Sequence, residues 1–149
     1  MPQVVLSVPP DPAFVRVVRL VATAMARKSG IDEDVLDDIR LAVGQACARA
    51  VSAHQDRGLS DPISITFADH ASVEVAVHDV VALEPAEGEQ AAALLSASTG
   101  QPADYTDSGE GAVPAIAGMA LLAALTGDLE LTTGPAGSVV RMRWRRSAG

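Results

Sequence analysis

Apolar and polar residues follow two rhythms along this chain, and these rhythms predict most of its secondary structure. Apolar side chains alternate with polar or small ones at positions 4–8, 63–67, 73–77 and 140–144. A period of two is typical of strands that bury one face and expose the other. An Asp-His turn joins the second and third of these segments, so they are expected to form an antiparallel hairpin.

Two segments between the first and second strands have helical periodicity instead. The first helix is predicted from Pro12 to about Lys28, with Asp11 as its N-cap. Its predicted apolar face consists of Phe14, Val17, Val18, Val21 and Met25. The second helix is predicted to begin among the acidic residues at 32–34 and to extend to about Ala53. Its predicted apolar face consists of Val35, Leu36, Ile39, Val43, Ala46, Cys47 and Ala50.

The second half of the chain is less regular. From 80 to 113 the composition shifts to Ala, Glu, Gly, Ser, Asp and Pro, which predicts a variable, lid-like loop with a candidate short helix at 87–95. An apolar helix is predicted from Ile116 to Leu125, and a closing hairpin follows with its turn at 134–137. This order of elements predicts an α+β fold, a two-layer sandwich with helices on one face of a mostly antiparallel sheet.

The composition fits a single folded domain over residues 1–149. Hydrophobic residues make up 48% of the chain but aromatic residues only 3%, so Val, Leu, Ile and Ala must form the core. The formal net charge of −8 argues against binding to nucleic acid, which requires a positive surface. No apolar run approaches the roughly 20 residues that span a bilayer, and one cysteine cannot form an internal disulfide. These features predict a soluble, cytoplasmic protein without membrane contact.

The most specific motif is the helical stretch from Asp37 to His54, which reads DDIRLAVGQACARAVSAH. It resembles the nucleotide-binding helix of the bacterial anti-sigma factor kinases, serine-protein kinases with the histidine-kinase-like (GHKL) ATPase fold. The resemblance extends from about Val4 to Trp144 and rests on the order of elements and on four motifs. It implies the same α+β sandwich, a site for ATP and magnesium, and a role in sigma factor regulation.

Two positions in this helix depart from the family pattern. Gln45 replaces the family's catalytic Glu, and Arg49 replaces the Asn that binds magnesium. A neutral amide cannot act as a general base near pH 7, and a guanidinium offers magnesium no oxygen ligand. Arg49 is therefore either a direct contact to a phosphate or a polar residue on an exposed helix face. The replacements favour a degenerate member of the family with no catalytic residue.

The other three nucleotide motifs are also altered. Asp79 is retained where the family contacts adenine, but Val81 takes a glycine position, and a β-branched residue disfavours the backbone angles that glycine adopts. The phosphate-binding glycine motif keeps only Gly118, with Ile116 crowding the phosphate path. In the final hairpin, Ser138 retains a hydroxyl that can reach a phosphate. Asp79 and Ser138 are otherwise a strand terminus and an ordinary hairpin residue. The candidates for a residual nucleotide site are Arg49, Asp79, Gly118 and Ser138.

The resemblance also implies where partners bind. Family members use the first helix for these contacts, with an early arginine in a Phe-x-Arg context, and Phe14-Val15-Arg16 matches that pattern. Arg16, with Arg19 one turn on, is therefore the candidate for partner contact, unless it is an ordinary exposed helix arginine. The implied partners are an alternative sigma factor and an anti-anti-sigma (STAS) protein, with a homodimer as a further assembly.

These residues favour an anti-sigma factor-like regulator that acts by binding and partner switching, without ATP or magnesium. The alternative is an active ATP-dependent serine kinase that phosphorylates the anti-anti-sigma partner and tolerates the altered motifs. A third reading is an interaction module that keeps the fold but binds unrelated partners. Titration with magnesium-ATP separates the first two.

Other candidate chemistry is weaker. His54, His70 and His78 match no metal-ligand spacing and are expected at the surface. Cys47 lies on the predicted apolar helix face and is expected to be buried. Four arginines near the C-terminus form either a basic patch or a solvated strand face, and the second is favoured: Arg141, Arg143, Arg145 and Arg146.

Overall fold

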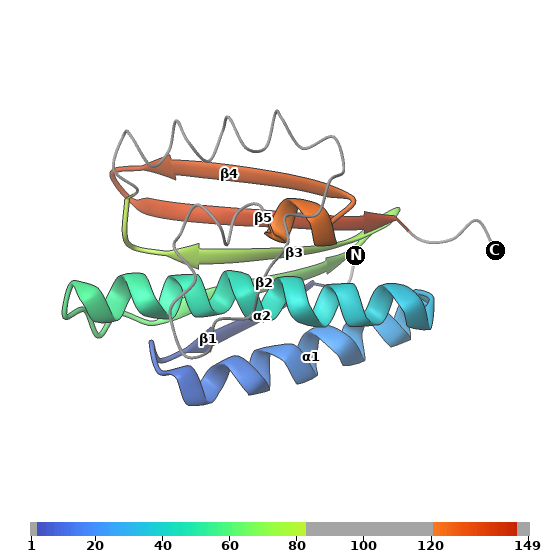
Figure 1. Ribbon diagram of the computed structural model, residues 1–149, viewed down its shortest axis with the longest axis horizontal. Helices are drawn as coiled ribbons and strands as arrows, with labels where there is room; N and C mark the ends of the chain where they lie inside the picture. The colour runs from blue at the N-terminus through green and yellow to red at the C-terminus, as the bar shows by residue number, and fades with distance from the viewer. Residues whose placement is uncertain (1–2, 83–120, 146–149) are drawn as a thin grey trace.

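In the computed structural model, which describes residues 3–82 and 121–145, five strands form one sheet (Figure 1). They are β1 (Gln3–Val8), β2 (Ile63–Asp69), β3 (Ser72–Asp79), β4 (Asp128–Gly134) and β5 (Gly137–Arg145). The strand order is β1-β2-β3-β5-β4, and every neighbouring pair is antiparallel. The two predicted hairpins, β2–β3 and β4–β5, are confirmed.

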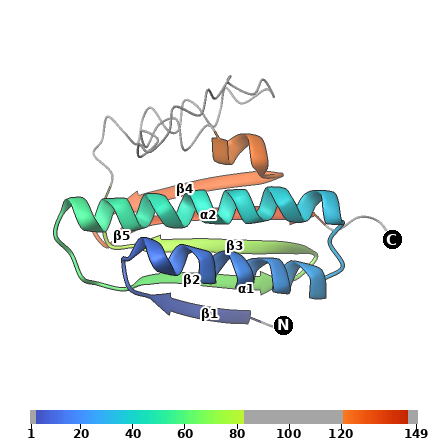
Figure 2. The same ribbon diagram turned by 60° about the horizontal axis from the view of Figure 1, so that its bottom comes forward.

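Helices cover one face of this sheet, which confirms the predicted two-layer α+β sandwich (Figure 2). A 3-10 turn, η1 (Pro12–Phe14), leads into α1 (Val15–Lys28), and α2 (Glu33–Asp56) follows. The Ala13 amide donates a hydrogen bond of 3.0 Å to the Asp11 carboxylate, so Asp11 caps this start as predicted. The second helix extends somewhat beyond its predicted end.

The buried face of α1 differs from the predicted one. Val18 is buried as predicted, whereas Phe14 and Val17 are 37% and 41% exposed. The remaining buried positions of the helix are Val15, Ala22 and Ala26. Small side chains let two helices approach closely, and α1 packs beside α2 as well as over the sheet (Figure 2). Val21 and Met25 are partly buried against the core, so the predicted apolar face is confirmed there and at Val18 and is wrong at Phe14 and Val17.

The core lies between the helices and the inner face of the sheet. Seven large side chains of the sheet are almost fully buried there: Ile63, Ile65, Phe67, Val75, Val77, Val140 and Met142. From α2 come Leu36, Ile39, Val43, Ala46, Cys47, Ala50 and, half-buried, Val35, which confirms the predicted apolar face. Trp144 Nε1 donates a hydrogen bond of 3.0 Å to the Leu125 carbonyl oxygen, which ties the short helical stretch at 121–125 to β5.

The opposite face of the sheet is polar, and two of its arginines, Arg141 and Arg143, form ion pairs. The Glu74 carboxylate on β3 lies 2.8 Å from Arg141 and 2.9 Å from Arg143, both on β5. From β4, Asp128 lies 3.5 Å from Arg143, and Glu130 lies 4.0 Å from Arg141. The hydrogen bond and charge of Glu74 raise the pKa of Arg143. This pairing agrees with a polar strand face rather than a basic patch.

Several predicted features lie outside the described residues. These are the candidate helix at 87–95, most of the lid-like loop at 80–113, the start of the helix predicted from Ile116, and Gly118 and Arg146. Among the helices that the structure does describe, none is long and apolar enough to cross a membrane.

Candidate functional site

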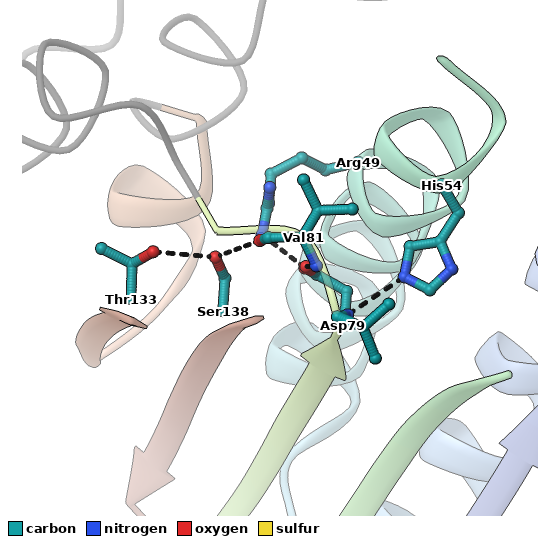
Figure 3. A network of polar contacts seen from close by, with 7 residues as sticks. Arg49, His54, Asp79, Val81, Thr133 and Ser138 are labelled. Atoms are coloured by element: carbon teal, nitrogen blue, oxygen red, sulfur yellow. Dashed lines mark hydrogen bonds and ion pairs between the residues drawn. The ribbon is translucent and has the colours of Figure 1, made fainter. Parts of the chain in front are cut away.

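The candidate site lies where the end of β3, the start of β5 and the second half of α2 meet (Figure 3). Strand pairing places Asp79, the last residue of β3, opposite Ser138 near the start of β5. Ser138 also pairs with Thr133 of β4, so these three polar side chains share one face of the sheet. Arg49 and His54 approach them from α2 (Figure 3).

An ion pair between Arg49 and Asp79 is the centre of the site. Arg49 Nη2 lies 2.8 Å from Asp79 Oδ2, and the two side chains are only 8% and 0% exposed. The other carboxylate oxygen, Oδ1, accepts a hydrogen bond of 2.9 Å from the Val81 amide. Both oxygens of Asp79 are thus engaged, one by a charge and one by the backbone that leaves β3. The buried Nε of Arg49 has no hydrogen-bond partner within the described residues.

This pair corrects one interpretation of Arg49. The view of Arg49 as a polar residue on an exposed helix face is wrong, because its side chain is buried against Asp79. Leaving an ionised carboxylate without compensation in a protein interior is costly, and a guanidinium at hydrogen-bond distance supplies that compensation. Asp79 is accordingly more than the polar terminus of a strand: it joins β3 to α2.

Ser138 and Gly137 fix the backbone that follows β3. Ser138 Oγ donates a hydrogen bond of 2.7 Å to the Val81 carbonyl oxygen and lies 3.2 Å from the Thr133 hydroxyl. Gly137 has a φ of 124°, and a Cβ there would collide with the Asp79 carbonyl oxygen and lie 2.7 Å from the Val80 Cα. The β4–β5 turn therefore passes directly against the end of β3, where only glycine fits.

His54 is buried, so its predicted surface location is wrong. Its Nδ1 lies 3.0 Å from the Asp61 carbonyl oxygen, and its Nε2 accepts a hydrogen bond of 3.2 Å from the Val80 amide. A neutral imidazole with its proton on Nδ1 makes both bonds. His54 follows Ala50 by one turn on the predicted apolar face of the helix, and that spacing was the available signal for its burial.

Burial perturbs two further titratable groups. It raises the pKa of the Cys47 thiol from 9.0 to about 11, while Arg19 acts in the opposite direction. Cys47 is therefore a neutral, buried thiol, and its predicted burial is confirmed. Burial, aided by the charge of Arg141, lowers the pKa of the half-buried His78, and Asp79 opposes this change.

Gln45 lies one turn before Arg49 on α2 and is half-buried. A neutral amide at this position does not take up a proton, and the neighbouring guanidinium offers no oxygen to a divalent cation. Within residues 3–82 and 121–145, no three His, Cys, Asp or Glu side chains come together in a way that would hold a metal ion.

Arg16 and Arg19, the candidates for partner contact, are both exposed on α1. In the described part of the chain, no carboxylate forms an ion pair with either of them. The Arg19 guanidinium lies across α2 at Gly44, where a Cβ would come within 2.8 Å of its Cζ atom. The Arg19 guanidinium thus lies at Gly44, whereas Asp79 is paired with Arg49.

The five-stranded antiparallel sheet and its helical layer are those of a known class of domain. The chain belongs to the family of histidine kinase-like ATPase domains, whose family model matches residues 8–144. Among curated proteins it is similar to the serine-protein kinase RsbW of Bacillus subtilis (strain 168), with 31% identity over 62 residues. It is also similar to RsbW of Bacillus velezensis, with 32% identity over 63 residues.

Each of these two matches covers 42% of this chain and 39% of the relative, so the matched stretch spans about two-fifths of the kinases' length. A solved structure, that of the RsbU and RsbW domains of Rv1364c from Mycobacterium tuberculosis, superimposes with a TM-score of 0.66. That superposition covers 98% of this chain and 32% of the other at 18% identity, and it supports the fold.

The sequence identified three members of the polar network but not the contacts among them. Arg49, Asp79 and Ser138 were singled out as candidate ligands of a nucleotide, and within the described residues they form hydrogen bonds to other groups of this chain. Arg49 and Asp79 carry opposite charges and belong to two motifs that were assigned to the same candidate site. Their pairing could have been predicted from that.

Proposed function

We propose that this protein is an anti-sigma factor-like regulator that binds an alternative sigma factor, an anti-anti-sigma (STAS) protein, or each in turn, without using ATP. It acts by partner switching in the cytoplasm, and its nucleotide site is closed by its own side chains. The membership of the histidine kinase-like ATPase family and the similarity to RsbW kinases support the general role. The side chains at the site support the loss of nucleotide chemistry.

The Arg49–Asp79 ion pair is the observation that carries this proposal. Asp79 stands where the family's carboxylate accepts the adenine amino group, and both of its oxygens are already bound. Arg49 stands where the family holds magnesium, and it brings a positive charge instead of an oxygen ligand. Gln45 supplies no base. The residues present do not fit a magnesium-bound nucleotide.

Val81 and Ser138 support the same conclusion. The Val81 side chain is 6% exposed and occupies a position where the family pattern has glycine. The Ser138 hydroxyl, a candidate phosphate contact, holds the Val81 carbonyl oxygen at 2.7 Å. Together with the His54 bond to the Val80 amide, these contacts fix the backbone across the site. A nucleotide would have to displace several buried hydrogen bonds to enter, and each such bond is costly to leave unmade.

The outer side of α1 is the proposed partner surface. Arg16 and Arg19 present two exposed cations on a chain whose formal net charge is −8. Three large apolar side chains are exposed on the same helical segment, namely Phe14, Val17 and Leu20. Arginines beside aromatic and aliphatic side chains are typical of protein–protein interfaces. This surface suits a partner that presents both acidic and apolar groups.

A homodimer is a further proposed assembly, and β1 supports it. This strand forms one edge of the sheet, carries no charged residue, and exposes Val4 and Val5 at 38% and 63%. An edge strand presents unpaired backbone groups that can pair with another strand. A second copy could therefore extend the sheet along β1.

Affinity capture of the tagged protein from its own cytosol, read by mass spectrometry with and without magnesium-ATP, tests the proposal. We expect a sigma factor or a small anti-anti-sigma protein in both samples and in equal amounts. Arg16→Ala should reduce this recovery about tenfold, as loss of an interface arginine does. Lys28→Ala, which removes another exposed cation of α1, is the matched control and should bind normally. Recovery of neither protein class would contradict the proposal.

The second candidate function is an active ATP-dependent serine kinase that phosphorylates the anti-anti-sigma partner. The similarity to two serine-protein kinases favours it. It requires Asp79 to exchange Arg49 and the Val81 amide for a nucleotide. Transfer of the terminal phosphate of ATP to a serine of the captured anti-anti-sigma protein would establish this function, and capture that depends on ATP would support it.

A further inference from the structure

Gly44 stands inside α2, where glycine is an unfavourable residue for a helix. Its φ is not positive, so its own backbone does not require glycine. It is buried beneath the Arg19 side chain of α1. A Cβ at Gly44 would collide with Arg19 Nε and lie 2.8 Å from both Cζ and Nη2. The nearest atoms all belong to one guanidinium, so the absence of a side chain at Gly44 makes room for Arg19.

We infer that Gly44 is a positioning residue: it forms a flat seat on α2 that holds the Arg19 guanidinium ready for a carboxylate of a protein partner. This inference rests on the proposed capture of a partner through α1. A guanidinium held against a helix has lost much of its rotamer freedom before binding, so less ordering remains to oppose the contact. Its planar donors suit a carboxylate in a two-pronged hydrogen bond.

The charges around Arg19 support the assignment. Five other arginines of the described chain form ion pairs with carboxylates, among them Arg40 with Asp37 and Arg27 with Glu33. Arg19 forms no such ion pair within the described residues, although it is exposed. On α2 its charge acts on Cys47, one turn after Gly44, and this thiol is buried and neutral. The positive charge of the Arg19 guanidinium is therefore available to a carboxylate of a protein partner.

The seat is tested first in the free protein, by NMR of the arginine side-chain Nε–H groups in wild type and Gly44→Ala. Gly44→Ala should fold with an equal or higher Tm, because alanine favours the helix and only a flexible side-chain end must move. The Arg19 Nε–H signal, assigned by its loss in Arg19→Ala, should shift and exchange faster with solvent. Gly134→Ala is the control, because a Cβ there meets no atom within 4 Å. An unchanged Arg19 signal in Gly44→Ala would overturn the seat, whether or not a partner has been captured.

The functional part is tested by titrating the captured sigma factor or anti-anti-sigma protein, once purified, into each variant. Arg19→Ala and Gly44→Ala should each weaken binding about tenfold. The double variant should bind no more weakly than Arg19→Ala alone, because both changes remove one contact. Normal binding by Gly44→Ala, with weak binding by Arg19→Ala, would overturn the seat and leave the proposed function standing. Normal binding by Arg19→Ala would overturn the inference by removing this arginine from the interface.

Discussion

At the scale of single residues, the burial of Arg49 and that of Asp79 depend on each other, because each side chain supplies the counter-charge of the other. They are 30 residues apart in sequence and meet because α2 packs across the end of β3. Each alone would be a costly buried charge, whereas together they form a short ion pair with a backbone amide on the second carboxylate oxygen. The pair thus joins the helix α2 to the end of the strand β3.

Removing one member of this pair should destabilise the fold. We expect Arg49→Ala to lower the free energy of unfolding by about 3 kcal/mol, because Asp79 then remains buried without a counter-charge. The double variant Arg49→Met/Asp79→Asn should recover most of this loss, since it replaces both charges with neutral groups of similar size. Urea denaturation of the three proteins measures the difference. A stability of Arg49→Ala equal to that of wild type would show that the pair contributes nothing to the fold.

Cys47 gives a prediction for alkaline pH. Its pKa is raised from 9.0 to about 11 on folding, so its contribution to stability is complete below pH 9 and is lost as the pH rises from 9 towards 11. The full loss amounts to about 3 kcal/mol. Urea denaturation at about pH 8 and about pH 10.5 should therefore show a steeper decline for wild type than for Cys47→Ala, which lacks the titrating thiol. Equal declines in the two proteins would contradict the buried, neutral state of Cys47.

Local sequence patterns identified individual residues better than their contacts. The burial of Cys47 followed from helical spacing, and the same spacing applied to His54. The pairing of Arg49 with Asp79 depends on how a helix crosses a strand, which periodicity does not determine. Asp79 was matched to a nucleotide contact because motif similarity reports on position and not on neighbouring charges.

At the scale of elements, the β4–β5 hairpin shapes the site through its turn. Gly137 lets this turn pass against the carbonyl of Asp79, and Ser138 then hydrogen-bonds the Val81 carbonyl oxygen. His54 binds the Val80 amide from the side of α2. A helix and a hairpin therefore hold the end of β3 from two directions (Figure 3).

A side chain at the turn should disrupt this arrangement. Gly137→Ala is expected to destabilise the protein by about 3 kcal/mol, because it combines an unfavourable φ with a clash against the backbone of Asp79 and Val80. Gly134→Ala in the same hairpin has open space around its Cβ and should be close to wild type. Thermal denaturation compares them. A Gly137→Ala variant as stable as Gly134→Ala would refute the close approach of the hairpin to β3.

The bounds and types of the helices and strands were predicted more accurately than the side on which each helix is buried. Alternating positions in β2, β3 and β5 gave the strands, because a half-buried strand leaves a period of two. The face of α1 was misjudged in part, because Phe14 and Val17 are exposed while the small residues Ala22 and Ala26 are buried. Helical spacing in the sequence marks all apolar positions of a helix face, including those that a protein partner rather than the core would cover.

At the scale of the whole molecule, the five-stranded sheet and its helical layer follow the ATPase-type fold, while the polar groups of the candidate site contact one another. The partner surface proposed on α1 is a separate feature from the Arg49–Asp79 pair on α2 and β3. Partner capture can therefore persist without nucleotide chemistry. This separation is the central claim for a regulator that works by binding alone.

Isothermal titration of the protein with magnesium-ATP tests that claim most directly, with a thermal shift recorded on the same sample. We expect no binding heat and no rise in Tm at millimolar nucleotide, because a ligand stabilises a fold only by binding to it. The same titration of Arg49→Ala shows whether the ion pair itself prevents nucleotide binding: if it does, this variant should bind magnesium-ATP. Saturable binding to wild type in the micromolar range, followed by phosphate transfer to a captured anti-anti-sigma protein, would contradict the account and identify an active kinase.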